Sequence, residues 1–403
     1  MRNRLMLSIA LLAIPFGAAL RAQLLRQPSN WLQNQTCTLC PTVASGRPPT
    51  TTFYVSPAGR DAASGSASAP WATIQRAADA ARPGTIVHVA PGTYIGSIKT
   101  TTSGTSAARI TFLSDTQWGA KIIAPISDSA WENRGDYVDI EGFDITGDGR
   151  MGILNLGSFV RIVGNHVHDI PAKCGNDGGA GIDNANYEAS DDDVIGNLVH
   201  NIGATLTVKC GTVQGIYHSN LRGHIMNNIV YRAWAYGIHL WHAPKSVVIA
   251  NNLVFQNGEA GILIGAGDAP GGVSASGMVV VNNIILNNPA SSWGKGQAIV
   301  ESGQTGTDNK YINNLIWNNT QGIMLQNGVV AAGTINADPR LVDYQANGGG
   351  DYHLSASSPM IGTGTLTGAP LIDFDGRIRP ANKRPDGGPY QSGAARAVWP
   401  WTY

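Results

Sequence analysis

The stretch that decides the fold is NNIVYRAWAYGIHLWHAPKSVVIANNLVFQNGEAGILIG, residues 227–265, because it contains one short motif twice. Each copy opens with two asparagines, continues with alternating apolar residues and leads to a Gly-Ile pair. The motif recurs along the chain, with its shared asparagine at Asn165, Asn197, Asn228, Asn252, Asn283 and Asn314. These asparagines are 32, 31, 24, 31 and 31 residues apart. The Gly-Ile pairs form a second series, with isoleucines at Ile153, Ile182, Ile216, Ile238, Ile262 and Ile323.

A repeat of this length, built from short alternating segments without helical periodicity, predicts a solenoid of β-strands. One unit cannot bury its apolar side alone, so each unit must stack on its neighbours. We therefore expect an all-β fold, a right-handed parallel β-helix. Its sheets should be parallel, and the isoleucines of the Gly-Ile pairs should form one buried column.

The recurring asparagines have a structural interpretation. At a sharp bend, asparagine tolerates left-handed backbone angles better than most residues. Its side-chain amide can also bond the equivalent asparagine one coil away, at a spacing of about 4.8 Å. We assign these asparagines to an internal ladder and expect no catalytic role for them.

The ends of the repeat region carry different patterns. PWATIQRAADAAR, residues 70–82, places Ile74, Ala77 and Ala78 on one helical face before Pro83-Gly84, which predicts a short capping helix over the open edge of the first coil. From about Asp338 the repeat fades into a closing cap. We divide the chain into a signal peptide (1–22), an N-terminal extension (23–50), the β-helix with its caps (51–390) and a C-terminal tail (391–403).

Composition and the N-terminus indicate a secreted protein. Arg2 and Arg4 precede an apolar stretch that runs from Leu5 to Leu20, the pattern of a secretion signal. Only 13% of residues are charged, against about 25% in average proteins. With a net charge of zero and no basic block, we expect no nucleic-acid partner. We also expect no membrane span in the mature chain, which should be a monomer.

Two of the four cysteines lie in similar segments. Cys174 is in AKCG and Cys210 in VKCG, one repeat apart, so we expect a disulfide between loops of adjacent coils. Their Cα atoms should then lie within about 7 Å. Cys37 and Cys40 form a single CxxC, which without a second pair is weak evidence for zinc.

The chain resembles a known group of proteins at both ends. The segment 53–94, from FYVSPAGRD to APGTY, resembles the opening module of secreted parallel β-helix proteins such as the family-9 pectate lyases. ADPRLVDY (337–344) and DFDGRIRP (373–380) are similar to the closing module of the same superfamily. The resemblance implies the fold, but it leaves the activity open between lyases, hydrolases, epimerases and non-catalytic proteins.

One feature of that group is missing. Its calcium-dependent lyases carry a clustered Asn-Asp-Asp-Gly-aromatic-Asp motif, which this sequence lacks. Asp191-Asp192-Asp193 is the nearest acidic run, and we interpret it as a solvated turn rather than a calcium site. We assign no metal ligands, and the cofactor is left open.

Alignment of the coils on Gly-Ile gathers ionisable residues on one outer wall. Asp183, Tyr217 and His239 occupy the same position in three consecutive coils, so each should lie about 4.8 Å from the next. Lys209 precedes the Tyr217 strand. We expect these four as catalytic residues, with substrate-binding residues at Trp234, Trp241, His218 and His242. His166, His168 and His200 recur on another face, where stacked structural histidines are the simpler interpretation.

This set suits the β-elimination of a polymer that contains uronic acid. The reaction needs a base for the proton next to the carboxylate, for which Lys209 or His239 is suited, and an acid for the leaving oxygen, for which Tyr217 is suited. Trp241 would stack on a sugar face. We therefore expect an extracellular polysaccharide lyase with a polysaccharide as its partner.

Two alternatives belong to other classes. A glycoside hydrolase on the same fold needs two carboxylates about 5–10 Å apart, for which Asp177 and Glu188 are the candidate partners of Asp183. A non-catalytic carbohydrate-binding or cell-envelope protein would instead present a flat wall on which Asp183, Tyr217 and His239 are out of reach of one another.

Overall fold

The computed structural model describes residues 51–125, 128–175, 178–242, 244–268, 273–292, 294–394 and 399–400. The expected signal peptide, the N-terminal extension and its Cys37–Cys40 pair lie outside these residues. Within the described ranges, no helix is long and apolar enough to cross a membrane.

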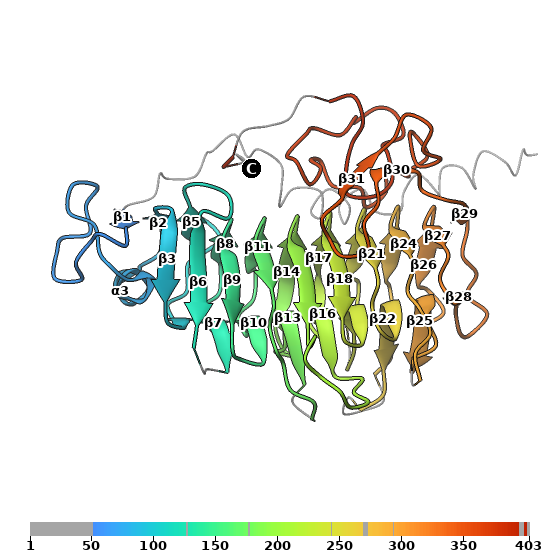
Figure 1. The fold of residues 1–403 in the computed structure, drawn as a ribbon, viewed down its shortest axis with the longest axis horizontal. Helices are drawn as coiled ribbons and strands as arrows, with labels where there is room; N and C mark the ends of the chain where they lie inside the picture. The colour runs from blue at the N-terminus through green and yellow to red at the C-terminus, as the bar shows by residue number, and fades with distance from the viewer. Residues whose placement is uncertain are drawn as a thin grey trace, which may run out of the picture. The chain divides into compact units, whose positions relative to one another are not determined.

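Three long sheets of parallel strands run the length of a right-handed β-helix (Figure 1). From β2 to β28 each coil contributes one strand to each sheet, as the repeat predicts, and β1 and β29 belong to incomplete coils at the ends. The first sheet consists of β1 (Thr51–Val55), β2 (Thr85–Val89), β5 (Ile110–Ser114), β8 (Val138–Glu141), β11 (Arg161–Val163), β14 (Ser190–Ile195), β17 (Leu221–Met226), β20 (Val248–Ala250), β23 (Val279–Val281) and β26 (Lys310–Ile312).

The second sheet carries the Gly-Ile pairs, and the third carries the strands that follow the recurring asparagines. The second sheet consists of β4 (Ile98–Thr100), β7 (Ser129–Asn133), β10 (Met151–Asn155), β13 (Gly179–Asn184), β16 (Val213–His218), β19 (Tyr236–Leu240), β22 (Ala260–Ala266), β25 (Gln297–Gly303) and β28 (Gln321–Met324). The third consists of β3 (Gly92–Ile95), β6 (Ala120–Ala124), β9 (Asp144–Gly147), β12 (His166–His168), β15 (Leu198–Ile202), β18 (Ile229–Ala233), β21 (Leu253–Phe255), β24 (Ile284–Leu286), β27 (Leu315–Trp317) and β29 (Ile335–Asn336).

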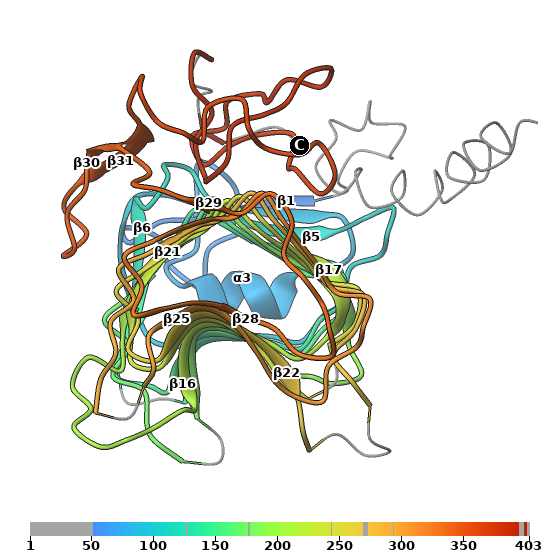
Figure 2. The same cartoon turned by 90° about the vertical axis from the view of Figure 1, so that its right-hand side faces the viewer.

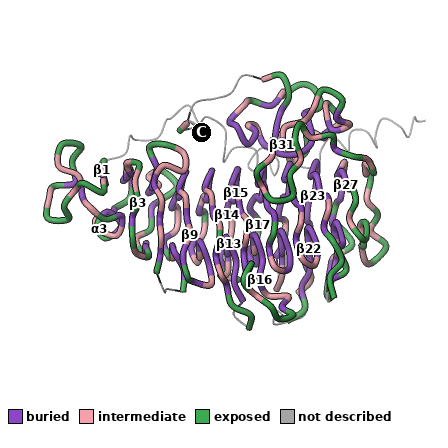
Figure 3. Tube along the Cα trace, viewed as in Figure 1, coloured by how far each residue is buried: buried purple, intermediate pink, exposed green. Residues whose placement is uncertain are grey.

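The predicted isoleucine column is the core of the second sheet. The isoleucines of adjacent strands are paired in register and are completely buried: Ile153, Ile182, Ile216, Ile238 and Ile262. Because side chains alternate along a strand, the residue after each isoleucine faces outward. Figure 3 shows the result, with buried strands and exposed connecting loops. The prediction of a parallel solenoid is confirmed.

The recurring asparagines form the expected ladder inside the coil. Each side-chain amide donates to the side-chain oxygen of the next asparagine at 2.9–3.1 Å, from Asn165 through to Asn314. The expectation of left-handed angles at these asparagines is wrong by one position. The residue before each of them has the positive φ: Gly164, Gly196, Asn227, Asn251, Asn282 and Asn313. That residue makes the bend, which leaves the ladder asparagine free to point inward.

A helix covers the first coil, whereas the C-terminal segment lies against the outside of the coil (Figure 1 and Figure 2). The helix α3 (Ile74–Ala80) buries Ile74, Ala77 and Ala78, and Thr73 caps its N-terminus by accepting from Arg76 N at 3.2 Å. Figure 2 looks along the coil and shows α3 lying across its end. At the other end of the sequence, β30 (Leu341–Asp343) and β31 (Asp351–Leu354) form an antiparallel pair. The closing cap expected from about Asp338 does not cover the last coil, because this segment packs through Tyr352 and Phe374 on the outer face of the third sheet (Figure 2).

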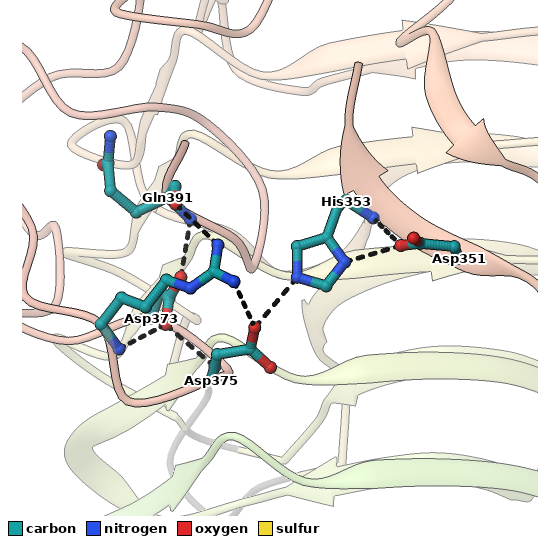
Figure 4. Close-up of polar contacts among 6 residues, drawn as sticks. Asp351, His353, Asp373, Asp375 and Gln391 are labelled. Atoms are coloured by element: carbon teal, nitrogen blue, oxygen red, sulfur yellow. Dashed lines mark hydrogen bonds and ion pairs between the residues drawn. The ribbon is translucent and has the colours of Figure 1, made fainter. Parts of the chain in front are cut away.

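The C-terminal segment is held together by a polar cluster around His353 (Figure 4). His353 lies between two carboxylates, with Nδ1 2.6 Å from Asp351 Oδ1 and Nε2 2.9 Å from Asp375 Oδ2. Asp373 accepts from the backbone of Asp375 and of Gln391 at 2.9 and 2.7 Å. These bonds join β31 to the DFDGRIRP turn, so charge as well as packing holds this segment together.

Two further expectations concern connecting loops. The Cys174–Cys210 disulfide is confirmed, with a Cα–Cα distance of 5.7 Å.

The expectation that Asp191-Asp192-Asp193 forms a solvated turn is wrong, because Asp192 and Asp193 are buried. Asp192 accepts from Val160 N at 2.8 Å, and Asp193 is 2.6 Å from His224 Nδ1. These contacts join residues at β11, β14 and β17, so the run belongs to the buried structure of the first sheet.

Candidate active site

Three consecutive strands of the second sheet build the wall of a cavity. Asp183 on β13 pairs with Tyr217 on β16, which in turn pairs with His239 on β19. All three follow a buried isoleucine, so all three face outward. Together with Trp241 they line a cavity of about 550 Å³. The expected adjacency of these residues is therefore present in the structure.

Asp183 is the most perturbed carboxyl group of this cavity. The residue is only 6% exposed, and its Oδ1 has no hydrogen-bond partner among the described residues. Burial raises the pKa of Asp183 to about 7, although the positive charge of Arg150 acts in the opposite direction. Near neutral pH this carboxyl group is therefore divided between its protonated and ionised forms.

His239 is held in one tautomer by Gln214. The amide of Gln214 is satisfied when its nitrogen donates to the carbonyl oxygens of Gly179 and Thr212, at 2.9 and 3.2 Å, and its oxygen accepts from His239 Nδ1 at 3.0 Å. Burial, with a smaller contribution from His242, lowers the pKa of His239 to about 3. The imidazole is therefore neutral, and its Nε2 carries a free lone pair.

Tyr217 stands between the carboxyl group and the imidazole. Its ring meets that of His239 edge-on, with centroids 5.4 Å apart. Burial, and then the neighbouring charge of Asp183, raise the pKa of Tyr217 above its ordinary value. The phenol thus remains protonated and has a proton to donate.

Trp241 forms part of the same wall, beside glycines of the following coils. A β-carbon at Gly265 would lie 2.4 Å from its indole ring, and one at Gly267 would lie 2.9 Å away. Only residues without a side chain let the indole lie this close to the backbone. The ring centroid is 5.9 Å from that of His239, so the indole borders the ionisable groups.

The expected residue His242 belongs to a chain of hydrogen bonds that the sequence does not reveal. Its Nδ1 is 2.7 Å from Asp268 Oδ1, and its Nε2 is 2.7 Å from the hydroxyl of Tyr187. A carboxylate, an imidazole and a phenol are thereby linked at the edge of the cavity. Tyr187 and Asp268 come from loops outside the repeat, where no periodic signal marks them.

Arg150 is a further residue that sequence reasoning missed. It lies just before β10, lines the cavity and forms an ion pair with Asp128, with Nε 2.6 Å from Oδ1. This pair brings a positive charge to the wall beside Asp183. The sequence does indicate this position locally, because Arg150 directly precedes β10, the strand that pairs with the Asp183 strand β13.

Three expected site residues do not line the cavity. His218 is fully buried inside the coil, where its Nδ1 is 3.0 Å from the Asn184 amide, because it is one position beyond the outward Tyr217. Trp234 packs partly buried against the core and donates to Val208 O at 3.1 Å. Lys209 is on an exposed loop, where its charge acts on Glu259 instead. We leave these three out of the proposed site.

The carboxylates considered for hydrolysis also have different positions from those expected. Glu188 is exposed and lies outside the cavity lining, and Asp177 lies outside the described residues. The cavity does contain a second carboxyl group besides Asp183, namely Asp268.

Comparison with known proteins agrees with this architecture. Residues 214–338 match a family model described as a right handed beta helix region, and residues 57–102 match a family of proteins of unknown function, DUF1565. No curated protein matches the sequence. The fold is that of the pectate-lyase-like parallel β-helices.

Several solved structures are similar to this chain. Pectate lyase Pel9A superposes with a TM-score of 0.55 at 17% identity, over 85% of this chain and 96% of that chain. An alginate lyase from Paenibacillus sp. str. FPU-7 gives a TM-score of 0.48 at 20% identity, over 71% of this chain and 95% of that chain. A rhamnogalacturonan lyase gives 0.47 at 17% identity, over 71% and 87%. At such identities the likeness concerns the fold alone.

Proposed function

We propose that this protein is an extracellular polysaccharide lyase that cleaves a uronic-acid-containing polymer by β-elimination. The observation that carries the proposal is the single cavity in which Asp183, Tyr217 and His239 are adjacent, with Trp241 at its wall. The N-terminal signal and the disulfide support a location outside the cytoplasm.

In this proposal each group has one role. His239 Nε2 removes the proton next to the uronate carboxyl group, because Gln214 keeps the proton of the ring on Nδ1. The electron pair of the broken C–H bond forms the new C=C bond, and the glycosidic C–O bond breaks. Tyr217 donates its proton to the departing oxygen. The enzyme is restored when the imidazolium returns a proton to the phenolate through solvent.

The charge that develops on the uronate must be stabilised for the proton to leave. Asp183 in its protonated form donates a hydrogen bond to that carboxylate, and Arg150 supplies positive charge nearby. An anionic substrate also raises the proton affinity of the neighbouring imidazole, which makes His239 a stronger base once the substrate is bound. Trp241 offers a flat apolar surface for a sugar ring.

A second candidate function is glycoside hydrolysis. The observation that favours it is the presence of two carboxyl groups, Asp183 and Asp268, in the same cavity. A raised pKa suits Asp183 to protonate a leaving oxygen, with Asp268 as the partner carboxylate.

The experiment is a panel of polyuronates and neutral glycans incubated with the full mature chain. Ultraviolet absorbance of unsaturated ends and the appearance of reducing ends are followed in parallel. The lyase proposal expects both signals, from polyuronates only. Reducing ends without unsaturation would establish the hydrolase, and binding without either signal would leave a non-catalytic carbohydrate-binding protein.

Variants then test the roles of the residues. His239→Ala and Tyr217→Phe should each lower turnover by about a hundredfold or more while the fold is retained. His88→Ala and Tyr54→Phe are matched controls, because these two residues stack on one another on the first sheet, away from the cavity. Normal turnover in both site variants would overturn the assignment. Trp241→Ala should weaken binding of the polymer more than it lowers turnover.

A further inference from the structure

We propose that the outer face of the third sheet holds a transition-metal site, with His166, His168 and His200 as ligands and Asp144 beside them. The three imidazoles each offer one nitrogen, and these nitrogens lie within 4.8 Å of one another. The site is on β9, β12 and β15, whereas the proposed active site is on β13, β16 and β19 of the second sheet. It is therefore separate from the cavity and independent of the proposed function.

The geometry of the nitrogens goes beyond ordinary stacking. His168, His200 and Tyr231 form a ladder of parallel rings, with centroids 5.3 and 4.7 Å apart, and such a ladder by itself is structural. His166 does not belong to this ladder, because it pairs with Leu198 in the neighbouring column. Its Nε2 nevertheless lies 2.8 Å from Nε2 of His200. Two ring nitrogens thus converge from different columns.

The carboxylates around the histidines complete the donor set. Asp144 Oδ1 is 2.8 Å from His168 Nε2, and Asp144 Oδ2 is 3.9 Å from His166 Nδ1. On the far side of its ring, His168 Nδ1 is 2.7 Å from Asp169 Oδ2. Metal-binding histidines usually donate their second N–H to a carboxylate in this way, which fixes the ring. Two carboxylates would also balance the charge of a divalent cation.

The donor types select the metal. Imidazole nitrogens with a carboxylate suit Zn²⁺, and also Co²⁺, Ni²⁺ and Cu²⁺, better than Ca²⁺ or Mg²⁺, which prefer oxygen ligands. Two nitrogens bound to one tetrahedral zinc ion lie roughly 3.3 Å apart. Small rotations of the side chains bring the present nitrogens to that spacing. The side chains of His166 and His168 are 19% and 13% exposed, so an ion can enter and is then largely shielded.

A bound ion would connect three consecutive coils. β9, β12 and β15 are neighbours in the third sheet, so one ion would join residues that are already linked by backbone pairing, ring stacking and the contacts His166–His200 and His168–Asp144. Because the folded state alone presents this set of ligands, metal binding would stabilise the folded protein.

The proposal is tested by calorimetric titration of the full mature chain with Zn²⁺. The chain is made without a histidine tag and is treated with chelator beforehand. We expect one ion per chain, a higher unfolding temperature with Zn²⁺, and a tetrahedral visible spectrum when Co²⁺ replaces it. His200→Gln and, separately, His166→Gln should weaken binding at least about tenfold and remove the Co²⁺ bands.

Two matched controls keep the result specific. His88→Gln removes a histidine that also contacts a carboxylate, Asp115 at 2.7 Å, on another sheet, and it should leave binding unchanged. Circular dichroism checks that each variant is folded, and His166→Gln is informative even if His200→Gln does not fold. Absence of stoichiometric binding to the wild-type chain, or equal binding in a folded His166→Gln, would overturn the proposal and leave a structural histidine stack.

Discussion

Asp183 illustrates how a single residue acquires its chemistry from its neighbours. Its position on the wall follows from the repeat, but its proton affinity follows from burial in the cavity, which raises its pKa to about 7. A carboxyl group with that pKa changes charge within the working range of most proteins.

The pH dependence of turnover tests this assignment. If the protonated form of Asp183 is the active one, kcat/KM falls as the pH rises through about 7, because the ionised form repels the uronate. Asp183→Asn, which stays neutral, should retain activity and lose this alkaline limb. An inactive Asn variant with normal folding would instead show that the ionised carboxylate is required.

His353 supports a prediction about stability. Hydrogen bonds to Asp375 and Asp351 raise the pKa of His353 above its ordinary value, so the folded state binds this proton more tightly than the unfolded state. Its stabilisation is therefore present below the unfolded pKa of about 6.5 and is lost as the pH rises through the folded pKa. His353→Gln should lower the free energy of unfolding at about pH 5 by about 1 kcal/mol or less, and by less still at about pH 9. Denaturant midpoints measure both values, and an equal loss at both pH values would contradict the role of the charge.

At the scale of elements, the ladder explains why an asparagine recurs just before the third-sheet strand of each coil. The residue before each ladder asparagine adopts the left-handed bend, and the asparagine itself satisfies groups inside the coil. Asn252 donates to Asn283 Oδ1 and Ile225 O, at 2.9 and 2.8 Å, and accepts from Asn228 Nδ2 at 3.0 Å. Each coil therefore supplies partners for the coils on either side.

Removal of one ladder side chain should be costly. Asn252→Ala leaves buried donors and acceptors without partners, each worth about 1–3 kcal/mol, so the free energy of unfolding should fall by at least about 2 kcal/mol. Asn347→Ala is the control, because Asn347 is exposed and, among the described residues, accepts a single local hydrogen bond from Gly349 N. Equal chemical denaturation curves for the two variants would contradict the structural importance of the ladder.

At the scale of the whole molecule, α3 covers an open end of the parallel sheets. An uncovered end of a parallel sheet presents unpaired backbone groups that can bind another chain. The α3 helix covers the first coil through Ile74, which is 2% exposed.

Disruption of this cap should therefore cause association. Ile74→Asp places a charge under the helix, and we expect oligomers or aggregates in light scattering that follows size exclusion. Asp79→Asn, an exposed change in the same helix, should give the wild-type profile. Wild-type behaviour of a folded Ile74→Asp variant would show that α3 is not needed to protect the edge.

The sequence by itself determined the coil, the buried isoleucine column, the ladder and the adjacency of Asp183, Tyr217 and His239. The physical reason is that a solenoid converts equal position in the repeat into proximity along one axis, so periodicity alone places these residues. Only the tertiary structure decided what surrounds them. Tyr187, Asp268 and Arg150 reach the cavity from segments outside the periodic pattern, while Lys209 and Trp234 lie outside its lining, because the paths of loops do not follow the repeat. The burial of Asp183 and His239 arises from this packing, and it sets their proton affinities. No periodic pattern in the sequence indicates how deeply either residue is buried.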